Sequence, residues 1–327
     1  MQYRRLGRSG LKISALSFGS WVTFSNQVDS ELAEAMLTLA YEAGINFFDN
    51  SEAYAHGRSE KLMGEALKRL GFERDTWCVS SKAFFGRVRD ARPTQLGLAR
   101  KHLVEACHAA LRRLQVDYLD LYFCHRPDPE TPIEEVVRTM NILIRQGKVL
   151  YWGTSEWSAG EIGAAWACAE RLGLEPPAME QPQYNLFHRR RMEVEYASLF
   201  RDLGIGATIW SPLASGILSG KYSEGIPEGS RFDVKGYEWL RDMVHSERGR
   251  KRIETASKVA GVARELDATP AQLALAWCLH NPDVSTVILG ASKPEQLKEN
   301  LGALEVYNRL DDSAVTRLEE LTQTAAD

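Results

Sequence analysis

The sequence predicts an α/β fold, a closed (β/α)8 TIM barrel with an N-terminal β-hairpin and long loops over the C-terminal face. Three observations lead to this prediction. Short apolar runs rich in β-forming residues recur along the chain, segments with apolar residues at helical spacing separate them, and 327 residues suffice for one large barrel. The length also suits two average domains, but the recurring pattern favours one barrel domain over residues 1–327.

The candidate strands number eight and alternate with helical segments. Alternation of this kind implies parallel strand pairing through helical crossovers. The clearest helical segments are Glu31–Ala43, Thr94–Leu114 and Ile133–Gln146. The candidate strands are Ser14–Gly19, Ile45–Phe48, Trp77–Ser81, Leu119–Phe123, Val149–Ser155, Ala178–Gln181, Gly206–Ser211 and Thr286–Gly290.

The segments outside this alternation have their own expected places. The opening "YRRLGRSGLKIS" reads as a hairpin that could plug the bottom of the barrel. The stretch Leu213–Lys251 is too long for a simple connection and predicts an excursion over the barrel mouth. Four helix starts match a capping box, with Ser or Thr three residues before Glu or Gln, at Thr131, Ser158, Thr269 and Ser292.

Composition excludes several classes of protein. The net charge of −4 gives no support to nucleic-acid or membrane-surface binding, and no stretch is apolar enough to insert into a membrane. Five scattered cysteines without a C-x-x-C pair, and no signal peptide, fit a reducing cytoplasm. The histidines lack metal-ligand spacing, so no metal is expected. The G-x-G-x-x-G of a Rossmann dinucleotide site is also missing.

Polar residues at predicted strand ends form a short list of candidates. Asp49 and Tyr54 follow one strand, Lys82 ends the next, and His125 ends the one after. Each has a structural alternative: Asp49 could cap a helix, Tyr54 could be loop packing, Lys82 could be solvated and His125 could be structural. In a (β/α)8 barrel, however, such residues converge at one mouth.

Together these four side chains suit proton transfer. A tyrosine holds its proton too tightly near neutrality, and a neighbouring lysine ammonium would lower the pKa of Tyr54 by stabilising its phenolate. Asp49 would keep Lys82 charged and oriented, and His125 could donate a hydrogen bond to a substrate carbonyl. The carbonyl carbon still needs a nucleophile, and hydride from a nicotinamide is the natural candidate.

Longer motifs along the whole chain resemble the aldo-keto reductases, and most of all the branch containing the voltage-gated potassium channel β subunits. They are "GINFFDNSEAYAHGRSE", "SSK", "HRPDPETP", "QGKVLYWGTSEWS", "WSPLASGILSGKY", "KGYEWL" and "ILGASKPEQLKENLGA". The resemblance implies an NADP-dependent oxidoreductase that reduces aldehydes and ketones to alcohols, with NADPH rather than NADH as cofactor. It also implies a homo-oligomer, by analogy a tetramer.

The resemblance also implies roles for individual residues. Tyr54 would be the general acid and Asp49, Lys82 and His125 would complete a tetrad. A substrate pocket would be shaped by Trp21, Phe24, Phe84, Phe85 and Arg126. NADPH would be bound by Ser20, Trp21, Gln27, Asp49, Ser155, Gln181, Trp210, Ser211, Pro212, Leu213, Ala214, Ser215, Lys221, Arg231, Gly290, Ser292, Gln296, Glu299 and Asn300.

Two departures from the family pattern bear on function. Glu156 follows Ser155 where many members have Asn, so one contact to the cofactor carboxamide could be missing or left to Gln181 alone. The mammalian channel subunits commonly carry Asn at the position of His125, and the histidine restores the full reductase tetrad. This favours an enzyme over the alternative, a channel-subunit-like module that binds NADPH as a redox signal. An ion-channel partner is compatible with the sequence but not indicated by it.

Overall fold

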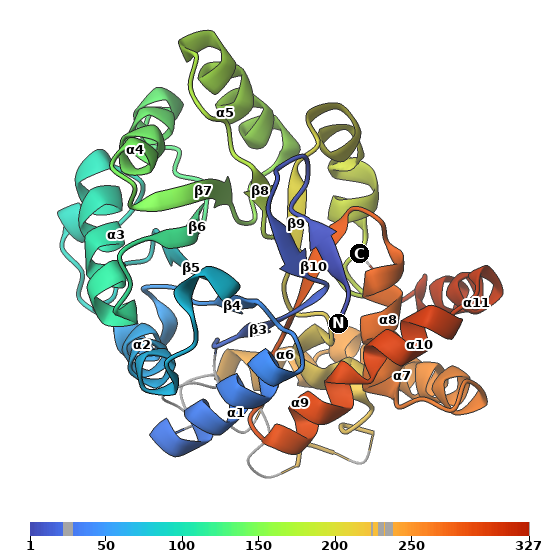
Figure 1. Cartoon of the computed structure of the whole chain (residues 1–327). Helices are drawn as coiled ribbons and strands as arrows, with labels where there is room; N and C mark the ends of the chain where they lie inside the picture. Colours follow the sequence, from blue (N-terminus) through green and yellow to red (C-terminus); the bar gives the residue numbers. More distant parts are fainter. Residues whose placement is uncertain (22–28, 224, 228–231, 233–237, 327) are drawn as a thin grey trace.

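The computed structural model describes residues 1–21, 29–223, 225–227, 232 and 238–326. Eight strands form a closed barrel in the order β10-β3-β4-β5-β6-β7-β8-β9, and every neighbouring pair is parallel (Figure 1). The predicted (β/α)8 barrel is therefore confirmed. The strands are β3 (Leu16–Gly19), β4 (Phe47–Asp49), β5 (Cys78–Ala83), β6 (Leu119–Cys124), β7 (Val149–Thr154), β8 (Met179–Glu180), β9 (Gly206–Ile209) and β10 (Val284–Leu289).

Helices connect successive strands and surround the barrel, as Figure 1 shows. The connection after β8 consists of short π-helical turns, Arg191–Glu195 and Leu199–Leu203. The long connection after β9 contains the 3-10 segment Ala214–Ser219 and then α6 and α7, and parts of it lie outside the described residues. The helices are α1 (Ser30–Glu42), α2 (Arg58–Leu70), α3 (Arg100–Leu114), α4 (Ile133–Arg145), α5 (Ala159–Leu172), α6 (Glu238–His245), α7 (Glu247–Glu265), α8 (Pro270–His280), α9 (Pro294–Leu301), α10 (Ala303–Arg309) and α11 (Asp312–Thr322).

The predicted hairpin is also confirmed. Strands β1 (Tyr3–Arg5) and β2 (Lys12–Ser14) pair antiparallel, and the dark-blue hairpin lies over β9 and β10 in Figure 1. Leu6 and Ile13 are fully buried in one cluster with the barrel-interior side chain of Phe123. Gly7 allows the close approach, because a Cβ there would lie 2.3 Å from the carbonyl oxygen of Gly204. The hairpin thus closes one end of the barrel with apolar side chains.

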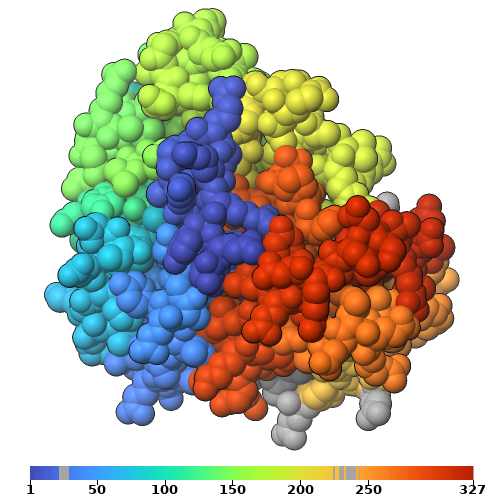
Figure 2. Space-filling view, turned by 45° about the vertical axis from the view of Figure 1, so that its right-hand side comes forward, coloured from blue at the N-terminus to red at the C-terminus, as the bar shows by residue number. Residues whose placement is uncertain are grey.

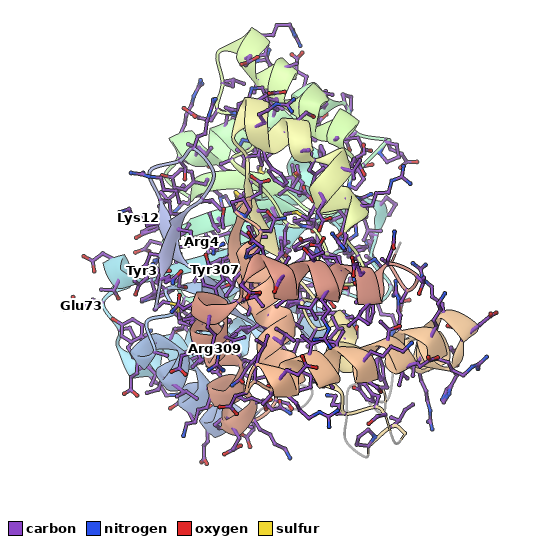
Figure 3. The ribbon with its side chains drawn as sticks, turned by 90° about the vertical axis from the view of Figure 1, so that its right-hand side faces the viewer. Tyr3, Arg4, Lys12, Glu73, Tyr307 and Arg309 are labelled. Carbon is purple, nitrogen blue, oxygen red and sulfur yellow. The ribbon has the colours of Figure 1, made fainter. Side chains whose placement is uncertain are left out.

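The C-terminal helices pack beside this hairpin. Figure 2 shows the dark-blue N-terminal residues and the red C-terminal helices lying side by side on one face. Arg4 donates to the carbonyls of Leu279 at 2.7 Å and Val284 at 2.8 Å, and its guanidinium carbon lies 5.4 Å from the ring centre of Tyr307. Figure 3 shows Arg4 and Tyr307 next to each other on this face. The guanidinium therefore joins the first strand of the chain to the last barrel strand and its neighbours.

Two of the four predicted capping boxes are correct and two are wrong. Ser158 and Thr269 each form the reciprocal box with the residue three positions on. Thr131 does not, since α4 is capped by Pro132 and the Thr131 hydroxyl donates to Asp128 Oδ2 at 2.7 Å. At Ser292 the helix starts one residue later than predicted, because Pro294 occupies a first-turn position and makes Lys293 the N-cap.

The helix predicted to begin at Thr94 begins later. Residues Pro93–Gln95 form a separate 3-10 turn, and α3 starts at Arg100. Gly97 lies between them with φ +73, a left-handed conformation that interrupts a helix. The sequence pattern had joined two elements across this glycine.

A tight layer inside the barrel lies directly below the strand ends that carry the site. Gly153 on β7 faces Met179 on β8, and a Cβ on Gly153 would lie 2.2 Å from the Met179 carbonyl oxygen. Side chains two positions further along a strand share its face, so this contact sets the spacing of Ser155 and Gln181 above it. The absence of a side chain at Gly153 is therefore a packing requirement.

We predict that Gly153→Ala destabilises the protein by about 1–3 kcal/mol, because the added methyl group must displace backbone of the neighbouring strand. Gly163→Ala is the matched control: nothing lies within 4 Å of its Cβ position on α5, and alanine favours a helix by about 0.5–1 kcal/mol. Urea unfolding of both variants measures the difference. Equal midpoints for Gly153→Ala and wild type would contradict this account.

Candidate active site

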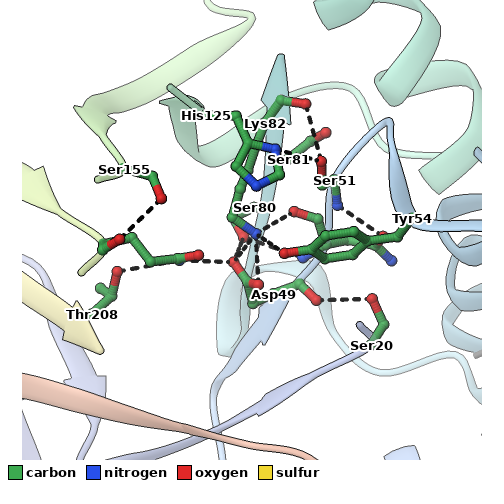
Figure 4. A network of polar contacts seen from close by, with 12 residues as sticks. Ser20, Asp49, Ser51, Tyr54, Ser80, Ser81, Lys82, His125, Ser155 and Thr208 are labelled. Carbon is green, nitrogen blue, oxygen red and sulfur yellow. Dashed lines mark hydrogen bonds and ion pairs between the residues drawn. The ribbon is translucent and has the colours of Figure 1, made fainter. Parts of the chain in front are cut away.

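Four polar side chains meet at the carboxyl ends of neighbouring barrel strands. Asp49 is the last residue of β4, Lys82 lies on β5, His125 follows β6, and Tyr54 begins the 3-10 turn Tyr54–Gly57 after β4. Figure 4 shows the Lys82 side chain pointing to both Asp49 and Tyr54. Parallel strands that end at one edge bring these residues together although up to 76 positions separate them in the chain (49 to 125).

The centre of the group is a buried ion pair. Lys82 Nζ lies 2.7 Å from Asp49 Oδ2 and 2.8 Å from Oδ1, and the lysine side chain has no solvent exposure. Asp49 Oδ1 also accepts from Ser80 Oγ at 2.7 Å and Gln181 Nε2 at 3.1 Å. Charges removed from water need partners of this kind, because an unpaired buried charge costs several kcal/mol.

The hydrogen bonds that Lys82 donates determine where the hydroxyl hydrogen of Tyr54 can point. An ammonium group has three donors. Besides Asp49, Lys82 Nζ contacts the Asn50 carbonyl at 2.8 Å and Tyr54 Oη at 3.0 Å. Since Tyr54 Oη accepts from Lys82, its own hydrogen must point elsewhere. Tyr54 lines the main cavity, so that space is available to its hydrogen.

The expected direction of the tyrosine pKa was wrong for the structure as it stands. Burial, and then the charge of Asp49, raise the pKa of Tyr54 well above its ordinary value, with Arg126 opposing. Burial also lowers the pKa of Lys82, although Asp49 opposes that change. The sequence places a lysine charge near Tyr54, but it shows neither the desolvation of the phenol nor its distance from the Asp49 carboxylate. Tyr54 therefore stays protonated near neutral pH.

His125 is neutral in this environment. Burial, and then the positive charges of Lys82 and Arg126, lower the pKa of His125 well below its ordinary value. Its Nδ1 lies 3.1 Å from Ser51 Oγ, and its ring centre lies 6.0 Å from that of Tyr54. The Nδ1 side is thus tied to the loop that carries the tyrosine, and His125 lines the cavity beside Tyr54.

A cavity of about 680 Å³ runs from these residues to α9. Most residues predicted to bind cofactor or substrate line it, including Asp49 itself. They are Trp21, Phe85, Arg126, Ser155, Gln181, Trp210, Ser211, Pro212, Leu213, Ser215, Lys221, Gly290, Ser292, Gln296, Glu299 and Asn300.

A few predicted residues have other positions. Ser20 is buried and its Oγ donates to the Asp49 carbonyl at 3.1 Å, and Ala214 is a buried residue of the loop after β9. Neither appears among the described residues that line the cavity, and neither does Phe84, which packs against the core. Phe24, Gln27 and Arg231 lie outside the described residues.

The loop after β9 has the character of a binding loop. Ser211, Ala214 and Ser215 all have positive φ, between 48° and 60°, which is uncommon for residues with side chains. Strain of this kind costs about 1–3 kcal/mol per residue and clusters at functional sites. Lys221 and Lys293 line the same cavity. Two lysines in the wall of one cavity suit a ligand that carries phosphate groups.

Glu156 has a structural role that the sequence did not indicate. Its φ is +60, and its Oε1 accepts from Trp210 Nε1 at 2.9 Å and from the Gln183 amide at 2.6 Å. Arg191 donates to Oε2 at 2.9 Å. The carboxylate therefore holds the ring of Trp210, which meets Trp21 edge to face at 5.8 Å between ring centres. The structure thus gives Glu156 a role in holding Trp210, which is separate from the contact to the cofactor carboxamide considered from the sequence.

Three residues of the site were missed. Ser80 precedes Lys82 by two positions on the same strand, so period-two spacing could have placed it on the same face. Ser51, which contacts His125, lies between Asp49 and Tyr54 but carried no signal of its own. Lys293 lines the cavity as the N-cap residue of α9, one position after the cap that the sequence predicts at Ser292.

Three findings concern features outside this site. Across the described residues, no group of three or more His, Cys, Asp and Glu side chains could hold a metal ion. Nor does any described helix have the length and apolar character needed to cross a membrane. All five cysteines are free and buried.

The eight-stranded parallel barrel has a buried carboxylate–lysine–tyrosine chain at the carboxyl ends of its strands, where (β/α)8 barrel enzymes have their active sites. The chain belongs to the aldo/keto reductase family, whose model matches residues 15–323. A "Probable voltage-gated potassium channel subunit beta" from Arabidopsis thaliana is 48% identical over 330 residues, covering 99% of this chain and 97% of that protein. The family supports an oxidoreductase that uses a nicotinamide cofactor and acts on small carbonyl compounds.

We predict that Glu156→Ala weakens binding of the nicotinamide cofactor about 3- to 10-fold, because the ring of Trp210 loses its acceptor and one such hydrogen bond contributes about 1 kcal/mol. Glu156→Gln keeps an acceptor oxygen at Oε1 and should lose less. Titration of NADPH fluorescence measures both dissociation constants. If the alanine variant bound NADPH as tightly as wild type, the hydrogen bond from Trp210 to Glu156 would not contribute to binding in the cavity.

Proposed function

We propose that the protein is an NADPH-dependent reductase that converts aldehydes and ketones to alcohols, with Tyr54 as general acid. The observation that carries this proposal is the 3.0 Å contact between Lys82 Nζ and Tyr54 Oη. The other donors of Lys82 are committed to Asp49 and the Asn50 carbonyl, so the lysine donates to the tyrosine and leaves its proton free for a substrate.

When bound, reduced nicotinamide supplies a hydride to the carbonyl carbon. As negative charge develops on the carbonyl oxygen, Tyr54 gives its proton to that oxygen, and the alkoxide is basic enough to take it. The phenolate left on Tyr54 is stabilised by the Lys82 ammonium, an attraction of about 4 kcal/mol at 4 Å and an effective dielectric constant of about 20. Asp49 keeps the ammonium in place throughout.

His125 contributes as a neutral donor. Its lowered pKa keeps the imidazole uncharged, so it does not add a positive charge next to Lys82. In this role Ser51 Oγ would donate to Nδ1, which lies 3.1 Å away, and the ring proton would lie on Nε2. That N–H can donate to the substrate carbonyl oxygen, orient it and draw off developing charge.

The cavity supports NADPH as the cofactor. Trp210 would stack on the nicotinamide, and Ser155 and Gln181 would hold its carboxamide, because the Gln181 amide nitrogen faces Asp49 and leaves its oxygen to accept. Lys221, Lys293 and the loop Ser211–Ser215 would meet the phosphates. Arg231 would add a further cation, and Ser292, Gln296, Glu299 and Asn300 would meet the adenosine end. Cations at the adenosine end favour NADPH over NADH, because only NADPH carries a 2′-phosphate there.

A second candidate function rests on the 48% identity to a protein named a probable channel β subunit. In that case the chain would bind NADPH as a redox-sensing subunit of an ion channel, with weak catalysis. The family resemblance further supports a cytoplasmic homo-oligomer, by analogy a tetramer. The two functions differ in turnover: a reductase cycles NADPH with free carbonyl compounds, whereas a sensor binds it and turns over little.

We predict that the wild-type protein oxidises NADPH in the presence of simple aldehydes, and NADH more slowly. Tyr54→Phe should lower kcat about 10²- to 10⁴-fold, because the transition state loses its proton donor, while NADPH affinity changes by less than about threefold. Absorbance at the nicotinamide band follows turnover, and fluorescence titration follows binding.

Two results would contradict the proposal. Tight NADPH binding without turnover of any aldehyde or ketone would favour the sensor function. A fully active Tyr54→Phe variant would show that Tyr54 is not the general acid.

Ser59→Ala is a matched control for a hydroxyl lost near the tyrosine loop, since Ser59 is buried on α2 and is not among the described residues that line the cavity.

A further inference from the structure

The mouth of the active site carries a cation that the proposed tetrad does not include. Arg126 directly follows His125, and its half-buried side chain lines the same cavity as Tyr54. Its charge acts on the tetrad, since it opposes the rise in the pKa of Tyr54 and adds to the fall in the pKa of His125. An anion placed beside the reacting carbonyl would therefore lie in the field of this guanidinium.

One edge of the guanidinium is held and another is available. Nη1 donates to the His125 carbonyl and lies 3.4 Å from Ser155 Oγ. In the part of the chain that the structure describes, no acceptor is recorded for Nε or Nη2, and no carboxylate forms an ion pair with Arg126. The Nε and Nη2 edge of a guanidinium presents two parallel donors, which match the two oxygens of a carboxylate.

A rigid aromatic face lies next to this cation. The guanidinium carbon of Arg126 is 5.6 Å from the ring centre of Phe85, which is 44% exposed although it is a large apolar side chain. The same ring meets His125 edge to face at 5.1 Å. Such an exposed ring at a cavity mouth suits contact with a flat apolar ligand.

The loop that carries this ring is tied to the catalytic loop. Glu52 Oε1 accepts from the backbone amides of Phe84 and Gly86, each at 3.0 Å, and from His102 Nε2 at 3.0 Å. Glu52 lies between Asp49 and Tyr54 in the sequence. The aromatic face is therefore fixed relative to the tyrosine, and the pairing of ring and cation is a preformed feature of the site.

We propose that the preferred substrates are aldehydes or ketones that carry a carboxylate on a flat apolar body, with Arg126 binding the carboxylate and Phe85 the apolar body. This inference rests on the proposed function and specifies its substrate class. The carboxylate takes no part in the chemistry: hydride still goes to the carbonyl carbon and the Tyr54 proton to its oxygen. Arg126 thus acts on specificity, by an interaction made in the ground state and kept in the transition state.

The test compares 4-carboxybenzaldehyde with methyl 4-formylbenzoate, which has the same frame and reactive group without the charge. The 3- and 2-carboxy isomers vary the distance between carbonyl and anion. We expect the kcat/KM of the best acid to exceed that of the matched ester at least 10-fold, mainly through KM. In Arg126→Met this ratio should fall to about 1, and in Arg126→Lys it should be intermediate.

Arg87→Met is the control for general electrostatic attraction, because Arg87 is exposed on the neighbouring loop and is not among the described residues that line the cavity. It should keep the acid-to-ester ratio within about twofold of wild type. Ester reduction by Arg126→Met shows that the variant is folded and its tetrad works.

The outcomes separate the two proposals. If no carbonyl compound is reduced by the wild type, the proposed function itself fails. If the ester is reduced but no acid isomer is preferred, only the substrate class is overturned. If Arg126→Met keeps the wild-type acid-to-ester ratio of kcat/KM, Arg126 does not bind the substrate carboxylate and the inference is wrong. The same holds if the variant binds NADPH more than threefold more weakly while this ratio is unchanged, because Arg126 then binds a group other than the substrate carboxylate.

Discussion

The arrangement of the site depends on one buried ion pair, between Asp49 and Lys82. Two charges with almost no solvent contact need hydrogen-bond partners, and here Ser80, Gln181, the Asn50 carbonyl and the Tyr54 hydroxyl supply them. Because Lys82 donates to the Tyr54 oxygen from one side, the hydroxyl hydrogen of Tyr54 is available to the cavity. The Asp49 carboxylate also accepts from Gln181, so the tetrad and the part of the cavity wall that Gln181 forms are joined by one carboxylate.

The barrel makes such a pair possible. Asp49 and Lys82 come from neighbouring parallel strands, so their side chains reach each other without any loop that could move. The floor below is closed by the hairpin residues Leu6 and Ile13, which excludes water from the other end of the barrel. Burial then has two consequences. It raises the pKa of Tyr54, which keeps the proton on the phenol, and it lowers the pKa of His125, which keeps the imidazole neutral.

Much of this could be predicted from the sequence. Strand positions followed from apolar runs, and the rule that chemistry lies at strand ends selected Asp49, Lys82 and His125. The two wrong capping boxes arose because nearby residues outside the four-residue capping motif change which residue caps the helix. Thr131 fits a capping box, but Asp128 binds its hydroxyl, and Pro294 shifts a cap from Ser292 to Lys293.

Electrostatics and side-chain direction were harder to predict than position. The lysine was expected to lower the pKa of Tyr54, and the opposite direction follows from burial and from the distance to Asp49, neither of which is a property of sequence. Likewise Glu156 could be recognised as unusual, but only the fold brings it to Trp210, 54 positions away. Roles that depend on long-range contacts of this kind need the structure.

The central claim is that Lys82 acts on the reaction through Tyr54, and a double-mutant cycle tests it most directly. The measurement is kcat per NADPH-binding site for Tyr54→Phe, Lys82→Met and the double variant with one aldehyde. Because both substitutions remove one proton-transfer unit, the double variant should be within about threefold of the slower single variant. If the losses of the two single variants instead multiplied, Lys82 and Tyr54 would act independently and the account of the ion pair would be wrong.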